Sequence, residues 1–232
     1  MISPYRRLCK CGAVTLRATL FDMDGLLLDS EILWHKAEVE IFGALGVPLS
    51  DAMGRSTKGM YVNQVVTYWN TQYPWGEPSE DTVVNLLLER VGELVESEGV
   101  LMPGAVRALD LTSEHGPLGL ASSTPMDLIV RCLKHFGLLE RFAAIHSAEH
   151  EPFGKPHPGV FLSAAASLNV APDECLVFED SAAGVLAAKS GTMTVVAVPT
   201  PDDLYRPEFS LADLVLTSLE ELSPAWLDER FA

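Results

Sequence analysis

The sequence predicts an α/β protein: a parallel sheet with helices on both faces, interrupted near its start by an all-helical insertion. Short apolar runs typical of buried strands alternate with helix-length segments, which favours a parallel sheet. Several of these runs end directly in polar or charged residues. Between residues 32 and 98, in contrast, only helical periodicity is found.

The first expected strand, residues 16–21, leads into Asp22-Met23-Asp24-Gly25. Side chains alternate along a strand, so Asp22 and Asp24 are expected to point the same way, about 7 Å apart. Two neighbouring carboxylates repel unless a cation lies between them, and hard oxygen ligands suit Mg²⁺. An isolated motif of this kind is more often a polar turn, so it identifies no site by itself.

The inserted helices are expected in three stretches. The first begins at Asp29-Ser30-Glu31, with Ser30 as a plausible N-cap, and ends around residues 43–46. Two further stretches, 60–73 and 79–98, are separated by a Pro-Trp-Gly-Glu-Pro break. The prediction is an α-helical cap at 32–101, a Rossmann-like doubly wound core at 14–31 and 102–232, and an N-terminal extension at 1–13.

The remainder of the core is expected to alternate strands and helices. The expected strands lie near residues 117–121, 143–147, 174–178, 193–198 and 213–216. The expected helices lie near residues 104–115, 125–137, 157–168 and 181–190. Ligands of such sheets bind beyond the carboxyl ends of the strands, which is where the polar segments of this chain fall.

Three polar segments follow later strands in this way. They are Ser122-Ser123-Thr124-Pro125, Gly154-Lys155-Pro156 and Glu179-Asp180-Ser181. Each also has an ordinary interpretation: Thr124-Pro125 is typical of a helix start, and a loop lysine is usually solvated. A helix start is itself an anion site, so both interpretations of the first segment can hold. The Lys155–Pro156 bond is a candidate for the cis form, which would aim the lysine inward.

Taken together, Asp22/Asp24, Ser122, Lys155 and Glu179/Asp180 resemble the motifs of the haloacid dehalogenase-like superfamily of phosphohydrolases. The resemblance covers about residues 16–222. It is strongest to the sugar phosphatase and β-phosphoglucomutase-like branch, through the stretches 24–31, 74–75, 147–149, 155–158 and 179–181. Dehalogenases proper lack the second aspartate of the first motif, so Asp24 argues against carbon–halogen chemistry.

The resemblance implies a role for each motif residue. Asp22 is the expected nucleophile, forming an aspartyl-phosphate, and Asp24 the expected general acid and base. Mg²⁺ is expected on Asp22, the backbone carbonyl of Asp24 and Asp180, with Glu179 supporting the ligands rather than binding directly. The residues expected to bind the phosphoryl group are Ser122, Ser123 and Lys155. The resemblance also implies a helical cap between the first and second motifs.

Substrate choice is expected to lie in the cap. The candidates are Glu31, Trp34, Lys58 and Tyr61. A tryptophan at helical spacing is more often a core residue, so Trp34 has a structural interpretation as well. Sugar-phosphate members of the branch commonly carry an arginine just after the loop glycine, whereas this chain has Met60, Tyr61 and Val62 there.

The net charge, the hydrophobic content and the cysteines limit the classes of partner and the cellular location that we expect. A net charge of −16 disfavours nucleic acid and anionic membranes, and a chain with 48% hydrophobic residues can bury a sizeable core. No apolar run is long enough for a membrane span. Cys9 and Cys11 lack the partners of a zinc site, and with Cys132 and Cys175 they indicate no disulfide framework. We therefore expect a cytoplasmic monomer that acts on a small phosphorylated metabolite.

The leading hypothesis is a Mg²⁺-dependent phosphatase of small sugar or sugar-alcohol phosphates. A phosphosugar mutase is the nearest alternative, but residues 32–101 hold four basic against ten acidic side chains, a net charge of −6. A phosphonate hydrolase would need a Schiff-base lysine in the cap, where only Lys36 and Lys58 are found. A non-catalytic binding module on the same scaffold is the alternative of another class.

Overall fold

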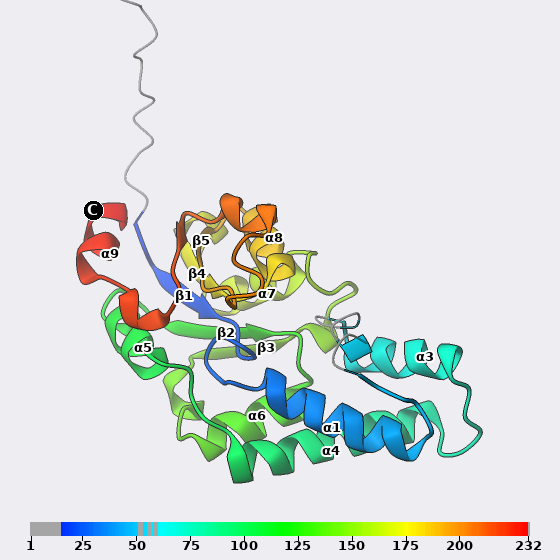
Figure 1. The fold of residues 1–232 in the computed structure, drawn as a ribbon. Coiled ribbons are helices and arrows are strands. Elements are labelled where there is room, and N and C mark those ends of the chain that lie inside the picture. Colours follow the sequence, from blue (N-terminus) through cyan, green and yellow to red (C-terminus); the bar gives the residue numbers. More distant parts are fainter. Residues whose placement is uncertain (1–14, 51–52, 55–56, 58–59, 232) are drawn as a thin grey trace, which may run out of the picture.

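The computed structural model describes residues 15–50, 53–54, 57 and 60–231. Its centre is a fully parallel six-stranded sheet in the order β3-β2-β1-β4-β5-β6 (Figure 1). The strands are β1 Ala18–Phe21, β2 Leu118–Ser122, β3 Ala144–Ser147, β4 Cys175–Glu179, β5 Thr194–Ala197 and β6 Leu214–Val215. The α/β fold class predicted from the sequence is therefore confirmed.

Alternating strand side chains divide the core into two layers. In β1, Leu20 packs with the α7 and α8 side of the sheet, whereas Phe21 packs with α5, α6 and the inserted helices. Phe21 stacks on Phe178 of the neighbouring strand β4, with ring centroids 4.8 Å apart. The covering helices are α5 Ala105–Ser113, α6 Met126–His135, α7 Gly159–Ser167, α8 Ala182–Ser190 and α9 Pro224–Phe231.

The strand order places a topological switch beside β1. The chain moves outward from β1 to β2 and β3, and then returns to pair β4 with the other side of β1. In open α/β sheets, ligands bind beyond the carboxyl ends of strands at such a switch. The polar segments after β1 and β4 therefore meet where the fold favours a binding site.

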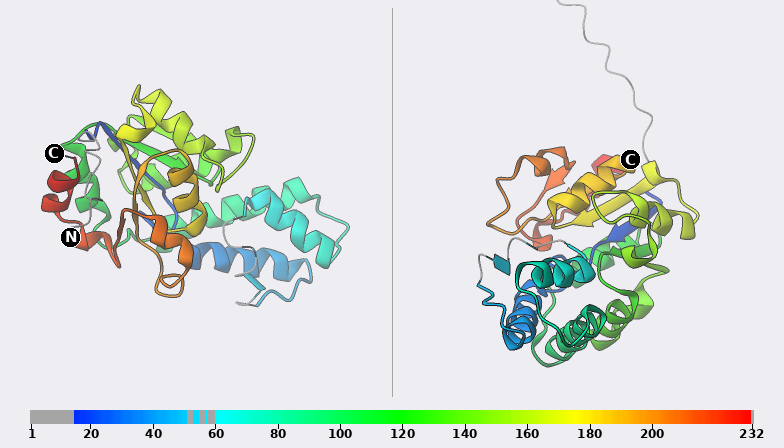
Figure 2. Two further views of the ribbon diagram at one scale, coloured as in Figure 1. Left: turned by 90° about the horizontal axis from the view of Figure 1, so that it is seen from above. Right: turned by 90° about the vertical axis from the view of Figure 1, so that its right-hand side faces the viewer.

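The helices between β1 and α5 whose bounds the structure describes lie together to one side of the sheet, as both views of Figure 2 show. They are α1 Glu31–Ala44, α3 Val62–Gln72 and α4 Glu80–Glu98. The chain enters and leaves this helical segment side by side: Leu28 bridges Leu101, and the Asp29 amide donates to the Val100 carbonyl at 3.1 Å. This paired linker connects the helices to the loop that carries Asp22 and Asp24.

The observed elements follow the predicted ones with small shifts at their ends. The predicted break at 74–78 separates α3 from α4, and no strand is found among the described residues between α1 and α4. Helix α9 was not predicted. The described residues also form short 3₁₀ helices at Leu139–Arg141, Ala148–His150, Pro172–Glu174, Pro207–Leu211 and Leu219–Glu221.

The domain limits 14–31, 32–101 and 102–232 stay a prediction. The extension at 1–13, with Cys9 and Cys11, and the cap candidate Lys58 lie outside the described residues. Of the helices that are described, none combines the length and the apolar character that a membrane crossing needs.

Candidate active site

A buried lysine joins two of the sequence-predicted acids. Asp22 follows the last residue of β1, and Lys155 lies in the loop after β3. The Lys155 Nζ donates to Asp22 Oδ1 at 2.6 Å, to Glu179 Oε1 at 2.5 Å and to the Ala121 carbonyl at 3.1 Å. Only 6% of the lysine side chain is exposed. The solvated-loop interpretation of Lys155 is therefore wrong.

The predicted cis geometry at Lys155–Pro156 is confirmed. All three donor positions of the ammonium are used by the oxygens of Asp22, Glu179 and Ala121. Burial opposes the charged form, but the two carboxylates outweigh it and raise the pKa of Lys155. The lysine is therefore a fixed cation at the carboxyl edge of β1 and β4.

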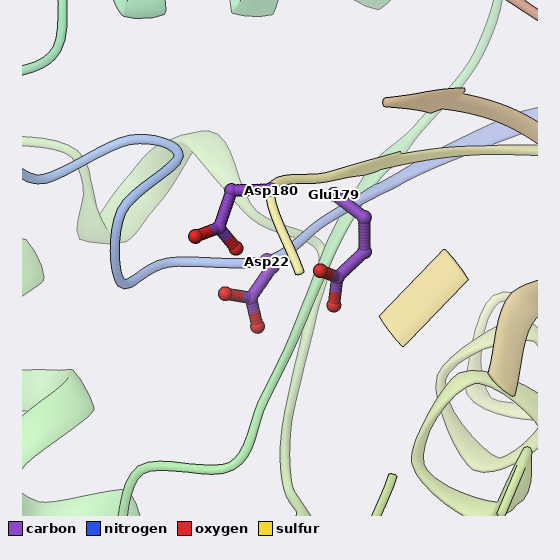
Figure 3. A group of neighbouring side chains, drawn as sticks. All are labelled: Asp22, Glu179 and Asp180. Atoms are coloured by element: carbon purple, nitrogen blue, oxygen red, sulfur yellow. The ribbon is translucent and has the colours of Figure 1, made fainter. Parts of the chain in front are cut away.

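Three carboxylates gather around this point, as Figure 3 shows. Asp22, Glu179 and Asp180 each place an oxygen within 4.8 Å of the others. Burial raises the pKa of Asp22 to about 7, although Lys155 opposes the shift. Burial and the charge of Glu179 also raise the pKa of Asp180. Three carboxyl groups thus share one lysine, and their hard oxygen donors suit a divalent cation such as Mg²⁺, which would favour their charged forms.

Gly25 allows the first loop to pass directly over Asp180. Its φ is +73°, and a Cβ built there would lie 2.4 Å from Asp180 Oδ2. Any larger residue would have to adopt an unfavourable backbone conformation and would also push the carboxylate away. The Asp-x-Asp-Gly turn and the Glu-Asp pair therefore fit together at this glycine.

Glu179 is fully buried, and both of its oxygens are occupied. Oε1 accepts from Lys155, while Oε2 accepts from the Ser181 amide at 3.0 Å and from the Ser181 hydroxyl at 2.9 Å. Its side chain thus orients the lysine and the start of α8. This arrangement agrees with the predicted supporting role of Glu179, which remains a prediction, as does direct ligation by Asp180 and by Asp24.

The carboxylate of Asp24 is held separately from the three-acid cluster. Oδ1 accepts from Ser30 Oγ at 2.6 Å and from Trp34 Nε1 at 3.2 Å. Oδ2 accepts from Thr124 Oγ1 at 2.6 Å and lies 3.5 Å from Ser122 Oγ. The carboxylate therefore joins the start of α1 to the segment after β2, and each of its oxygens has hydrogen-bond donors.

Two local predictions are corrected here. Ser30 precedes α1 but makes no side-chain capping bond, and Thr124 does not cap α6, which begins after Pro125. Both hydroxyls donate to Asp24 instead. A hydrogen bond from a hydroxyl to the Asp24 carboxylate is charge-assisted and roughly twice as strong as a neutral one, such as a capping bond to a backbone amide. The two hydroxyls therefore bind the carboxylate instead of capping the helices.

A cavity of about 300 Å³ opens beside Lys155 and Ser123. Tyr61 and Gln64 contribute to it from the start of α3, and Pro152, Phe153 and Gly154 from the loop after β3. The Tyr61 hydroxyl donates to the Ala148 carbonyl at 3.2 Å. A Cβ at Gly154 would lie 2.3 Å from that hydroxyl, so the glycine makes room for the tyrosine. The start of α3 and the lysine thus line the same cavity.

The cap candidates differ in position. Tyr61 lines the cavity, Trp34 contacts Asp24, and the charge of Glu31 helps to raise the pKa of Asp180. Gln64 and Phe153 were not predicted as site residues, and neither were the bonds of Ser30 and Thr124 to Asp24. No local motif identifies these residues. Thr124 contacts Asp24 across 100 residues, and Ser30 contacts it across six, which is beyond a single helical turn.

Comparison with known proteins agrees with this geometry. Residues 16–192 match the family of hydrolases described as haloacid dehalogenase-like hydrolase. The chain is 42% identical over 208 residues to hexitol phosphatase B of Escherichia coli (strain K12), which covers 89% of this chain and 94% of that protein. It is 26% identical over 223 residues to the β-phosphoglucomutase of Bacillus subtilis (strain 168), covering 93% and 96% of the two chains.

A solved structure of a related protein has the same fold. The crystal structure of CbbY from Rhodobacter sphaeroides in complex with phosphate superposes with a TM-score of 0.80, at 26% identity, over 90% of this chain and 97% of that one. The parallel sheet, the inserted helices and the acidic cluster around a buried lysine thus occur in a chain whose sequence matches this family over most of its length. The protein therefore belongs to the haloacid dehalogenase-like hydrolases.

Proposed function

We propose that this protein is a phosphoric monoester hydrolase that uses Mg²⁺ to hydrolyse small sugar or sugar-alcohol phosphates through an aspartyl-phosphate. The relatives that are at least 30% identical to this chain include hexitol phosphatase B and a validoxylamine A 7′-phosphate phosphatase. The observation that carries the proposal is the buried Lys155, which contacts Asp22 and also lines a cavity together with Ser123 and Tyr61.

In the first step, an oxygen of Asp22 bonds to phosphorus while the bond from phosphorus to the ester oxygen breaks. The leaving oxygen keeps the electron pair and takes a proton from Asp24. Lys155 lies next to the attacking carboxylate, so its positive charge offsets the charge of the transferring phosphoryl group. The Ser123 segment lines the same cavity and can bind the phosphoryl oxygens.

In the second step, water attacks the aspartyl-phosphate and gives a proton to Asp24. The bond between phosphorus and Asp22 then breaks, which releases inorganic phosphate, restores the Asp22 carboxylate and leaves Asp24 protonated, as it was at the start of the cycle. Asp22 and Asp180, with the Asp24 carbonyl, would hold the Mg²⁺, and Glu179 would orient Lys155. When bound, the cation supplies charge neutralisation at the phosphoryl oxygens.

The cavity supports a small polyol as the leaving group. Its volume of about 300 Å³ is at the low end for small-molecule sites. Tyr61 and Phe153 offer apolar faces, and Gln64 offers an amide for hydroxyl groups. A panel of phosphate monoesters, assayed with Mg²⁺ for phosphate release, tests the proposal. Turnover of sugar-alcohol and sugar phosphates is expected, whereas no turnover of any ester would favour the non-catalytic binding module.

Mutase activity is the second candidate, because the B. subtilis β-phosphoglucomutase is similar over most of the chain. A mutase must hold a second phosphate on the cap, ideally with an arginine. Among the described residues that line the cavity, the cap contributes Tyr61 and Gln64 but no cation. Incubation with β-glucose 1-phosphate and a trace of the 1,6-bisphosphate distinguishes phosphatase from mutase activity. Release of inorganic phosphate supports the phosphatase, whereas formation of glucose 6-phosphate without phosphate release supports the mutase.

A cytoplasmic location, a monomeric state and the absence of nucleic-acid binding remain predictions. The free thiols of Cys132 and Cys175, both buried, support a reducing compartment. Lys36 pairs with Glu98 on the surface of the inserted helices, which does not support a Schiff-base role for it.

A further inference from the structure

The two oxygens of Asp24 are held from opposite sides of the site. Ser30 and Trp34, at the start of α1, both donate to Oδ1. Thr124, in the segment after β2, donates to Oδ2, and the Ser122 hydroxyl lies 3.5 Å from the same oxygen. The inserted helices therefore contact one edge of this carboxylate, and the strand that carries the predicted phosphate-binding serines contacts the other.

The groups that donate hydrogen bonds to Asp24 differ in whether they can also accept one. A hydroxyl can donate or accept, so Ser30 and Thr124 can turn to suit either form of Asp24. The indole Nε1–H of Trp34 can only donate. An oxygen that faces this group must accept, and a proton placed on it would meet the indole hydrogen. Trp34 is thus the donor that makes the two carboxylate oxygens unequal.

We propose that Trp34 is a positioning residue that keeps Oδ1 of Asp24 as an acceptor, so that Oδ2 is the oxygen that delivers the proton to the leaving group. This inference rests on the proposed phosphatase function. In the transfer step, the bond between Oδ2 and its hydrogen breaks, and the hydrogen bonds to the departing ester oxygen. Oδ2 lies on the Ser122 side of the carboxylate, which faces the predicted phosphoryl site.

The dependence on the leaving group tests this role. The departing oxygen of an alkyl phosphate, such as a sugar-alcohol phosphate, needs a proton. The leaving group of p-nitrophenyl phosphate is p-nitrophenolate, which is stable as an anion and departs without one. The value of kcat/KM includes steps only up to departure of the leaving group. Trp34→Phe keeps an aromatic ring but removes the N–H. It is expected to lower kcat/KM about tenfold for the alkyl ester and less than twofold for the aryl ester.

Trp75→Phe is the matched control. Its Nε1 also donates a hydrogen bond within the inserted segment, to the Pro78 carbonyl at 3.0 Å, and its ring packs near Phe42, with the ring centroids 6.2 Å apart. It should change neither value by more than twofold. Ser30→Ala removes a hydroxyl that can also accept and leaves the Trp34 N–H on Oδ1, so it should show a smaller split between the two esters than Trp34→Phe.

Equal losses of kcat/KM for both esters in Trp34→Phe would overturn the inference, since they indicate a structural role. An unchanged value for the alkyl ester would overturn it as well. Retained turnover of the aryl ester also shows that the variant is folded. Failure of the proposed function looks different, because the wild-type protein would then hydrolyse neither ester.

Discussion

At the scale of single residues, Lys155 balances the buried charges of the site. It contacts Asp22 and Glu179 at hydrogen-bond distance, and all three side chains are less than 10% exposed. Neither carboxylate has another cationic partner among the ion pairs of the described residues. The ammonium therefore contributes to folding as well as to the proposed chemistry.

Lys155→Met is expected to lower the free energy of unfolding by about 3 kcal/mol at pH 7.5, because two buried carboxylates lose their counter-ion. Urea unfolding in the presence of EDTA measures this change without a contribution from metal. The double variant Lys155→Met/Glu179→Gln should recover part of the loss. Lys36→Met, which breaks the exposed pair with Glu98, should cost less than 1 kcal/mol. Equal losses at both lysines would contradict the assignment.

Asp22→Asn is expected to leave a folded protein with essentially no turnover, because an amide is a poor nucleophile. Folding is expected to persist because burial already raises the pKa of Asp22 to about 7, so a neutral side chain fits the position. Phosphate release and circular dichroism check the two parts. Asp127→Asn, at an exposed acid near the start of α6, is the control and should keep normal turnover. Wild-type activity in Asp22→Asn would exclude Asp22 as the nucleophile.

At the scale of elements, α1 contributes both to the site and to the hydrophobic core. Its first turn contacts Asp24 through Trp34, and its buried residues Leu33, Ala37 and Phe42 anchor it in the core. Glu38 lies on the same helix in a partly buried position, and a Cβ built at Gly54 would come within 4.0 Å of its Oε2. Burial raises the pKa of Glu38 from 4.5 to about 7, against the opposing charge of His35.

This shift predicts a pH dependence of stability. Between pH 4.5 and about 7, the folded protein binds the Glu38 proton more tightly than the unfolded chain, so stability falls as the pH rises. Glu38→Gln should therefore raise the free energy of unfolding by about 2 kcal/mol at pH 8 and leave it nearly unchanged at pH 4.5. Urea unfolding at both pH values measures the difference. Glu40→Gln, an exposed acid on α1 paired with Arg90, controls for the loss of one charge; a similar gain there would contradict the prediction.

At the scale of the whole molecule, the site depends on segments brought together by the sheet. Asp22 follows β1, Asp180 follows β4, and the inserted helices reach the cavity beside them through Tyr61. The three-acid cluster is thus assembled only in the folded chain, which couples binding of a cation to folding.

Metal removal should therefore have two effects. EDTA is expected to abolish phosphate release, and added Mg²⁺ to restore it, because the buried carboxylates otherwise repel an anionic ester. Mg²⁺ should also raise the Tm of the wild-type protein, because a ligand of the folded state stabilises it. Asp180→Asn should reduce this rise, whereas Asp127→Asn should not. Full turnover in metal-free buffer would exclude the proposed metal dependence.

The sequence alone determined the alternation of strands and helices, the inserted helices and the four polar segments at strand ends. These are local properties: apolar periodicity defines the elements, and a parallel sheet brings the carboxyl ends of its strands to one edge. Helix α9, near the end of the chain, was not predicted from the sequence. The prediction that Asp22, Lys155, Glu179 and Asp180 lie close together depended only on that topology and on the family resemblance.

Only the tertiary structure decided which partners the polar side chains choose. Ser30 and Thr124 look like helix caps in the sequence, yet both donate to Asp24, and Thr124 is 100 residues away from it in the chain. Tyr61 likewise reaches the Ala148 carbonyl across 87 residues. Capping preferences describe competition within one turn, so they do not include a charged acceptor such as Asp24 that lies outside that turn.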